Sequence, residues 1–236
     1  MNGIILAGGN GTRLDPITRY CHKHLLPIND KPMVYYPLKT LVDMGCSRIL
    51  VIVSPEYRKN YAMTLETINK WDIPIEIKVQ EVPSGIPEGF IIGKDFLADD
   101  GNLLILGDNY FEKIPKFKLK HSNKLHIFLK EMKNTAEYGS CNISKTEKIV
   151  SIKEKCKTMN QKFVITGLYL FQKSVVKDAE NLKKSKRGEF EILDIIKKYN
   201  KKNLLSYTIV PKKNTWRDLG SFREIAKTSY QLARKG

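Results

Sequence analysis

The chain has 236 residues, of which 42% are hydrophobic and 28% charged, and its 41 Lys and Arg outnumber 25 Asp and Glu. This balance excludes a disordered chain and a collagen-like repeat, and no apolar run reaches the roughly 18 residues of a membrane-spanning helix. The net charge of +16 indicates either that the protein binds a polyanionic partner or that lysines are scattered over its solvated surface. Because the lysines form loose groups without regular interleaving of aromatic residues, we expect no nucleic-acid partner. These groups are Lys116, Lys118 and Lys120, then Lys183, Lys184 and Lys186, then Lys197, Lys198, Lys201 and Lys202.

The first half of the chain alternates short apolar runs with helical patterns. A helix is expected to begin with Pro32 in its first turn and to end at Gly45, and a second covers about 56–70. A short helix then precedes the last strand of this half. The expected strands are Gly3–Ala7, Arg48–Ser54, Ile73–Val79 and Asn102–Leu106. Buried strands that alternate with helices indicate an α/β sheet with helices on both faces.

The second half is more mixed. A helix is expected over Phe190–Asn200, and the capping-box pattern from Ser221 to Glu224 predicts that a last helix starts after Ser221. The expected strands are Leu125–Leu129, Ile149–Lys153, Phe163–Phe171 and Leu204–Val210. No linker or repeat divides the chain, so we expect one domain over residues 1–236, with the second half placed like a lid.

The four cysteines lie far apart and have no C-x-x-C spacing; they are Cys21, Cys46, Cys141 and Cys156. Free thiols in a reducing cytoplasm fit this pattern best. The N-terminus has an apolar run but no basic n-region and no cleavage site, so we expect no signal peptide. The sequence therefore predicts a cytoplasmic protein that binds no membrane.

A glycine-rich loop follows the first strand directly. Gly8, Gly9 and Gly11 can bring backbone N–H groups up to phosphate oxygens, and Thr12 and Arg13 close the loop with a hydroxyl and a permanent cation. The loop matches neither the P-loop nor the G-x-G-x-x-G pattern. Because glycine-rich turns are also common without a ligand, the loop alone leaves both interpretations open.

Lys23 lies shortly after the loop, so the same mouth of the sheet can hold both Arg13 and Lys23. Two fixed cations suit a triphosphate whose α-phosphorus is attacked. Alternatively, Lys23 is one more solvated lysine, although the apolar sequence His-Leu-Leu-Pro that follows it argues against an exposed position. We expect His22 and His24 to be structural or exposed and not catalytic.

Two aspartates are candidate magnesium ligands. Asp108 stands at the end of an apolar strand, where ligands bind in open α/β sheets, and Asp218 follows another strand and a loop. One or two carboxylates together with phosphate oxygens and water commonly hold Mg²⁺. The alternative for each aspartate, taken separately, is a turn-capping role.

Several motifs occur together in one order: LAGGNGTRL, KHLLP, DKPM, YYPL, LGDN, YG, EK, TGLY, RGE and WRDLG. This combination resembles the bacterial sugar-1-phosphate nucleotidylyltransferases, most closely the glucose-1-phosphate thymidylyltransferases, over nearly the whole chain. The resemblance implies a Rossmann-like, mixed, mostly parallel sheet flanked by helices. It also implies a nucleotide-binding half over residues 1–112 and a sugar-phosphate-binding half over residues 113–236.

The resemblance assigns roles at matching positions only. The nucleotide would be held by Leu6, Ala7, Gly8, Gly9, Gly11, Thr12, Arg13, Lys23, Gln80 and Gly85. Among these, Gln80 and Gly85 match base-reading positions, and Arg13 and Lys23 would contact the phosphates as catalytic residues. The sugar phosphate would be held by Tyr138, Gly139, Glu154, Lys155 and Arg187. Asp108 and Asp218 would bind the Mg²⁺ cofactor.

The implied reaction joins a nucleoside triphosphate, expected to be dTTP, to a sugar 1-phosphate, expected to be glucose 1-phosphate, and releases pyrophosphate. Departures from the family pattern at residues 86–89, at 110–113, at Cys156 and in a shortened region before Tyr138 keep one alternative open, and the net charge of +16 keeps open a second. One is the same chemistry with UTP or CTP and another sugar or alcohol phosphate. The other is a non-catalytic relative that binds polyanions.

The chain stops soon after the helix that follows Asp218, whereas longer relatives carry extra C-terminal helices. We therefore expect weak or absent product feedback through a second site. The resemblance also implies a homo-oligomer.

Overall fold

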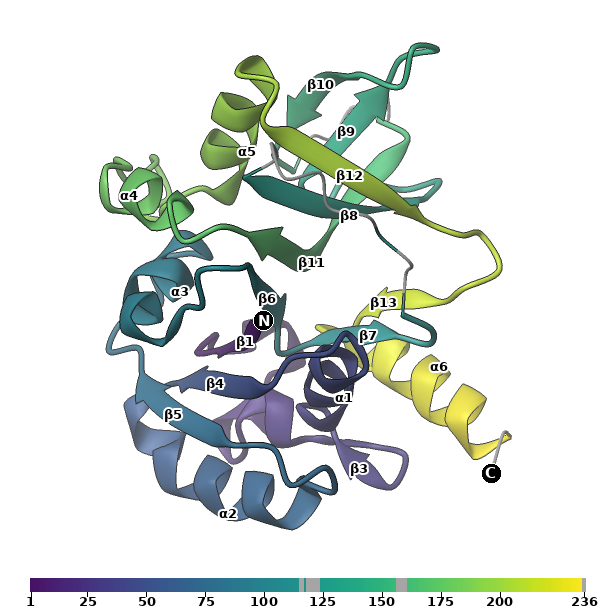
Figure 1. Cartoon of the computed structure of the whole chain (residues 1–236). Coiled ribbons are helices and arrows are strands. Elements are labelled where there is room, and N and C mark those ends of the chain that lie inside the picture. Colours follow the sequence, from purple (N-terminus) through teal and green to yellow (C-terminus); the bar gives the residue numbers. More distant parts are fainter. Residues whose placement is uncertain (115–116, 118–123, 156–160, 235–236) are drawn as a thin grey trace.

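A nine-stranded mixed sheet forms the framework of the chain (Figure 1). This computed structural model describes residues 1–114, 117, 124–155 and 161–234. The strands of the sheet are β1 (Asn2–Ala7), β4 (Arg48–Val53), β5 (Ile75–Val79), β6 (Asn102–Leu106), β8 (Leu125–Glu131), β9 (Ser140–Ile143), β10 (Ile149–Lys153), β11 (Phe163–Phe171) and β12 (Leu205–Val210). Their order is β10-β9-β11-β6-β1-β4-β5, and β8 joins β11 to β12.

The two halves of the chain contribute different kinds of strand pairing. β6, β1, β4 and β5 are parallel throughout, which places the ends of all four at one edge. β11 then runs antiparallel to β6, and most pairs of the second half are antiparallel, with β12 parallel to β8 as the exception. The expected fold class, a Rossmann-like mixed sheet with flanking helices, is confirmed.

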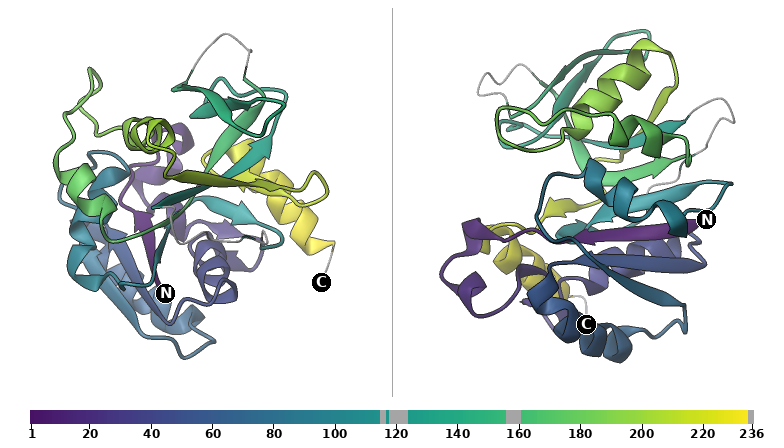
Figure 2. Two further views of the ribbon diagram at one scale, coloured as in Figure 1. Left: turned by 45° about the horizontal axis from the view of Figure 1, so that its top comes forward. Right: turned by 90° about the vertical axis from the view of Figure 1, so that its left-hand side faces the viewer.

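Side chains of alternate strand residues build a core on each face of the sheet, because neighbours along a strand point to opposite faces. Ile4 and Leu104 face a cluster that includes side chains from α3 (Pro87–Ile92), α4 (Val175–Glu180) and α5 (Ile192–Lys201). Ile5 and Leu103 face a second cluster with α1 (Tyr35–Asp43) and α2 (Arg58–Ile68). The helices therefore cover both faces (Figure 2).

A smaller layer lies beside the main sheet. It contains the two-stranded sheets β2 (Pro27–Ile28) with β3 (Lys31–Pro32) and β7 (Asn109–Phe111) with β13 (Trp216–Asp218), and the last helix α6 (Phe222–Ala233). The capping prediction is confirmed, because the Ser221 side chain accepts a hydrogen bond from the backbone N–H of Glu224 at the start of α6. Short 3₁₀ helices cover Thr12–Leu14, Ile17–Arg19, Lys23–Leu25, Pro55–Tyr57 and Lys94–Phe96.

The expected position of Pro32 was wrong. Pro32 lies in β3 and pairs with Pro27 in an antiparallel ladder, so the backbone is extended there and α1 begins only at Tyr35. Asp218 follows the expected strand, which is β12, and a loop, but it also ends the three-residue strand β13, which was not predicted. The short elements β7, β9 and α4 were not predicted.

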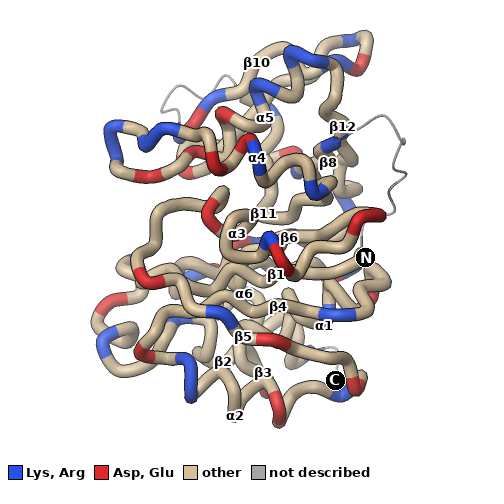
Figure 3. Tube along the Cα trace, turned by 60° about the vertical axis from the view of Figure 1, so that its left-hand side comes forward, with Lys and Arg blue, Asp and Glu red and all other residues tan. Residues whose placement is uncertain are grey.

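Lys and Arg residues are spread over many segments, with Asp and Glu residues between them (Figure 3). Within the described residues, no helix is long and apolar enough to cross a membrane. Cys21, Cys46 and Cys141 are free thiols, while Cys156 and the group Lys116, Lys118 and Lys120 lie outside the described residues.

Candidate active site

The carboxyl ends of four parallel strands bring the predicted nucleotide residues to one edge of the sheet. Leu6 pairs with Leu106 in register, so the segments after β1 and β6 leave the sheet side by side. The Ser54 hydroxyl, after β4, donates to the Gly8 carbonyl at 3.1 Å, and the Gln80 N–H, after β5, donates to the Val53 carbonyl at 2.8 Å. This edge is where ligands bind in open α/β sheets.

The glycine loop packs directly against Lys23. Gly11 has φ 66°, in the left-handed region that favours glycine, and a Cβ there would lie only 2.9 Å from the Lys23 Cβ. The Lys23 side chain therefore runs along the loop. Its Nζ atom is directed to the Asp108 carboxylate at 2.7 Å, and both side chains are mostly buried.

A second carboxylate–cation pair lies beside the first. In the β7–β13 ladder Asp218 pairs in register with Asn109, and the Leu219 N–H donates to the Asp108 carbonyl at 2.8 Å. The Arg13 guanidinium lies 3.3 Å from the Asp218 carboxylate. Residues from three distant parts of the sequence thus meet at one point, as the sequence analysis expected for Arg13, Lys23, Asp108 and Asp218.

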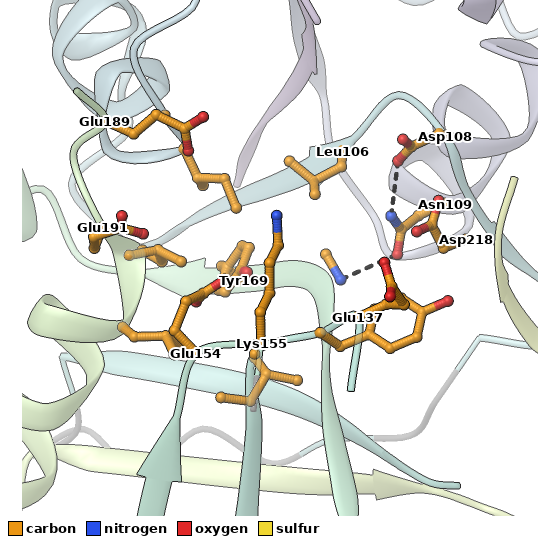
Figure 4. Close-up of a pocket in the computed structure, with 18 of the residues that line it drawn as sticks. Leu106, Asp108, Asn109, Glu137, Glu154, Lys155, Tyr169, Glu189, Glu191 and Asp218 are labelled. Carbon is orange, nitrogen blue, oxygen red and sulfur yellow. Dashed lines mark hydrogen bonds between the residues drawn. The ribbon is translucent and has the colours of Figure 1, made fainter. Parts of the chain in front are cut away.

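Asn109 holds this arrangement together, a role that the sequence analysis missed. Its buried Oδ1 accepts hydrogen bonds from the Gly167 N–H at 3.0 Å and from the Trp216 Nε1–H at 2.8 Å. Its Nδ2 donates to Asp108 Oδ1 at 3.2 Å (Figure 4). One amide therefore fixes the turn between β6 and β7 that carries Asp108, the strand β13 that carries Asp218, and β11.

The two carboxylates differ electrostatically. Burial alone would raise the pKa of Asp108, but the Lys23 ammonium outweighs it and holds this pKa well below its ordinary value. Burial and the neighbouring Asp108 carboxylate raise the pKa of Asp218 above its ordinary value. No group of three or more His, Cys, Asp or Glu occurs in the described part of the chain in a metal-binding arrangement. Two adjacent carboxylates still fit Mg²⁺, which takes one or two carboxylates together with ligand phosphate oxygens.

One cavity is lined by five of the ten predicted nucleotide residues. It is lined by Leu6, Gly9, Lys23, Gln80, Gly85 and Asp108, among others. The remaining nucleotide residues lie around it: Ala7 and Gly8 are buried behind the loop, Gly11 forms its turn, and Thr12 is exposed in the following 3₁₀ helix. Arg13 faces the adjacent cavity.

That adjacent cavity lies between the two halves of the chain and contains all five predicted sugar-phosphate residues. Its lining includes Tyr138, Gly139, Glu154, Lys155 and Arg187, together with Arg13, Asp108 and Asp218. The two cavities form one continuous site, because they share the lining residues Gly85, Ile86, Leu106, Asp108 and Glu189. In Figure 4 the aspartates lie at one end, Glu154, Glu189 and Glu191 at the other, and Lys155 extends between them.

The two cations of the second cavity differ in how they are paired. Arg187 lies 2.8 Å from Glu191, 3.4 Å from Glu154 and 4.0 Å from Glu189, so three carboxylates already surround its guanidinium. Lys155 has φ 35° and points into the cavity, and no carboxylate of the described residues lies within ion-pair distance of its amine. Lys155 is therefore the cation that is available to an incoming anion.

The comparisons with known proteins agree with this geometry. The family model described as nucleotidyl transferase matches residues 2–235. This chain belongs to the nucleotidyl transferase family. It is 38% identical over 230 residues to the glucose-1-phosphate thymidylyltransferase of Neisseria meningitidis, which covers 95% of this chain and 80% of the relative. The glucose-1-phosphate thymidylyltransferase of Mycolicibacterium smegmatis is 36% identical over 235 residues, with 97% and 81% covered.

Solved structures extend the similarity. A Bacillus anthracis protein, crystallised in complex with a sucrose and described as a glucose-1-phosphate thymidylyltransferase, superposes with a TM-score of 0.87 at 31% identity, covering 99% of this chain and 95% of that one. A UDP-glucose pyrophosphorylase complexed with UDP-glucose superposes with a TM-score of 0.80 at 18% identity over 100% and 99% of the chains, which supports the fold alone. The chain is therefore a nucleotidyltransferase.

The histidines beside Lys23 in this nucleotidyltransferase are structural, as expected. His22 and His24 are buried, and both Nδ1 atoms lie within hydrogen-bond distance of the Tyr61 hydroxyl, at 2.7 and 3.2 Å. Burial and the Lys23 charge lower the pKa of His22 to about 4. Both imidazoles are thus neutral and anchor the segment that carries Lys23 to α2.

Several lining residues of the nucleotidyltransferase site were not predicted: Glu137, Gly167, Tyr169, Glu189, Phe190, Glu191 and Trp216. Gly167, Tyr169, Glu189 and Trp216 lie inside motifs that the sequence analysis quoted, so the motifs located them without giving their roles. Gly85 and Phe190 meet closely, because a Cβ on Gly85 would lie 2.3 Å from the Phe190 carbonyl and Gly85 has φ 106°.

Proposed function

We propose that this nucleotidyltransferase transfers the thymidylyl group of dTTP to glucose 1-phosphate, which gives dTDP-glucose and pyrophosphate. The observation that carries the proposal is the continuous site in which two carboxylate–cation pairs lie between a glycine loop and a sugar-sized cavity lined by Glu154 and Lys155. The names of the relatives supply the thymidylyl and glucose parts of the proposal.

In this proposal residues 1–112 hold the nucleotide and residues 113–236 the sugar phosphate, within one domain. The triphosphate lies on the glycine loop, with Arg13 and Lys23 on its oxygens, and Gln80 and Gly85 contact the base. Lys155 binds the phosphate of the sugar, and Glu154 accepts hydrogen bonds from sugar hydroxyls. Arg187, surrounded by acidic side chains, orients Glu154 and balances its charge.

Asp108 and Asp218 would hold Mg²⁺, which the chemistry of their oxygen donors fits. When bound, the ion supplies positive charge to the phosphate oxygens and offsets the repulsion between the two carboxylates. Asp108 now pairs with Lys23, so ion binding requires Lys23 to exchange this carboxylate for a phosphate oxygen.

The reaction needs no general base from the chain. The second pKa of a phosphate monoester is about 6, so the sugar phosphate is largely dianionic at neutral pH and can attack the α-phosphorus directly. The chain has to align two anions that repel each other and to neutralise charge on the transition state and the leaving pyrophosphate. Arg13, Lys23 and Lys155 supply that charge from fixed positions.

A second candidate keeps the chemistry but uses UTP or CTP. It draws support from residues 86–89 and 110–113, where the sequence departs from the family pattern. A non-catalytic polyanion-binding role fits less well, because Arg13 and Lys23 are each directed at a site carboxylate. We include a homo-oligomer and a cytoplasmic location in the proposal, from the family resemblance and the free thiols respectively.

A thermal-shift panel of dTTP, UTP, CTP and ATP with Mg²⁺ tests the proposal first. A ligand at about 100 times its dissociation constant raises the free energy of unfolding by about 2.7 kcal/mol, so the preferred nucleotide should give the largest shift. Pyrophosphate release is then measured for each nucleotide with glucose 1-phosphate and other sugar phosphates. Absence of any nucleotide-dependent shift and of pyrophosphate release would refute the proposal.

A further inference from the structure

Glu88, in the segment that departs from the family pattern, makes an unusual set of contacts. Its Oε2 atom accepts hydrogen bonds from the Ser84 N–H at 3.1 Å, from the Ser84 hydroxyl at 2.6 Å and from Gln80 Nε2. Gln80 is buried, and its side chain lines the nucleotide cavity. The carboxylate of Glu88 therefore lies behind the residue that is expected to read the base.

A carboxylate can only accept hydrogen bonds, so it determines which way the neighbouring amide points. Gln80 must turn its NH₂ group toward Glu88, and its carbonyl oxygen then lies over Gly8, where a Cβ would approach Oε1 to 2.2 Å. An amide without such a partner can exchange its oxygen and nitrogen by rotation about the last side-chain bond. Glu88 removes that freedom.

This orientation matters because of the chemistry of pyrimidine bases. Thymine and uracil present a carbonyl oxygen next to an N3–H donor, whereas cytosine presents an amino group next to an unprotonated N3. Where thymine and uracil carry a hydrogen-bond acceptor and a donor, cytosine carries a donor and an acceptor. A glutamine amide that can flip can therefore form hydrogen bonds with both kinds of base, whereas a fixed amide can do so with only one.

We propose that Glu88 is a specificity-determining positioning residue that fixes the Gln80 amide and so makes the enzyme discriminate keto pyrimidines from amino pyrimidines. The inference rests on the proposed function, since it takes Gln80 as the base-reading residue.

The same carboxylate connects the base end of the site to the sugar end. The Ser84 carbonyl accepts a hydrogen bond from the Phe190 N–H at 2.7 Å, and Phe190 lies in the segment between Arg187 and Glu191 that lines the sugar cavity. Glu88 therefore holds both Gln80 and the loop that joins the two cavities.

Glu88→Gln tests the inference, because a glutamine of the same size can donate as well as accept and leaves the Gln80 amide free to flip. The dissociation constants of dTTP and dCTP are measured with Mg²⁺ by calorimetry, and kcat/KM is measured for both with glucose 1-phosphate. We expect the preference for dTTP over dCTP to fall roughly tenfold, about the value of one hydrogen bond, mainly through tighter dCTP binding.

The matched control is Glu81→Gln, which makes the same chemical change at an exposed residue of the loop before α3 and should leave the ratio unchanged. In a Gln80→Met background, which has no reading amide, Glu88→Gln should not change the ratio further. If Glu88→Gln also lowers the stability of the protein, this double-mutant cycle still isolates the part of the change that depends on Gln80.

An unchanged ratio in Glu88→Gln, or an equal loss for both nucleotides, would overturn the inference while the proposed function stands. Failure of the unaltered enzyme to turn over dTTP with glucose 1-phosphate would refute the proposed function instead, and the binding ratio would still test Glu88. If the unaltered enzyme binds neither nucleotide, both are wrong.

Discussion

Two substitutions of Asn109 test its effect on stability and its effect on the charge of the site separately. Its buried Oδ1 is the acceptor for two donors, the Gly167 N–H and the Trp216 Nε1–H. Asn109→Ala leaves both donors buried without this acceptor, and each such loss costs about 1–3 kcal/mol. We therefore expect the free energy of unfolding to fall by about 2–6 kcal/mol, seen as a lower urea midpoint at an unchanged m-value.

Asn109→Asp is the matched variant, since a carboxylate keeps an acceptor for both donors. It replaces the Nδ2–H that donates to Asp108 with a negative charge, which raises the pKa of Asp108. Because Asp108 must then reach a higher pH to ionise, the acid limb of the kcat/KM profile should move to higher pH. The reasoning is refuted if this variant is as unstable at pH 8 as Asn109→Ala, or if it is stable and its acid limb does not move.

Three further changes have defined outcomes. Burial lowers the pKa of His126 from 6.5 to about 4, so the unfolded chain takes up this proton first as the pH falls. As the pH falls from 6.5 to about 4, the free energy of unfolding therefore decreases, by at most about 1.4 kcal/mol per pH unit. Urea titrations at several pH values should show that the free energy of unfolding depends less on pH in His126→Gln than in the unaltered protein. Ser221→Ala removes the cap of α6 and should lower the free energy of unfolding by about 1 kcal/mol, whereas Ser221→Asp should retain it; equal stability of all three proteins would contradict the cap. Lys155→Met should raise the KM for the sugar phosphate about tenfold or more with little change in the KM for the nucleotide, whereas Lys153→Met, at an exposed position outside the cavity, should change neither.

Long, regular elements could be predicted from the sequence. The strands β10 and β11 have the expected bounds, because each is a run of apolar or alternating residues between clear breaks. The cap at Ser221 was also predictable, since its pattern is local. The strand at Pro32 was not, because a two-residue ladder with Pro27 leaves no periodic signal.

The site was predictable to the extent that motifs carry it. The glycine loop, Lys23 and both aspartates could be named, but Asn109 could not be assigned a role from sequence. Its partner Trp216 lies 107 residues away, and the three-residue strands that join them have no sequence signature of their own. The acidic surroundings of Arg187 likewise depend on how a non-helical segment folds beside Glu154.

The central claim is that Asp108 and Asp218 share one ion on the phosphates of a bound nucleotide. A structure of the protein with a magnesium complex of a non-hydrolysable dTTP analogue tests it most directly. We expect an ion about 2.1 Å from an oxygen of each aspartate, with the Lys23 ammonium moved from Asp108 onto a phosphate oxygen. A nucleotide-bound ion that contacts neither aspartate would contradict it.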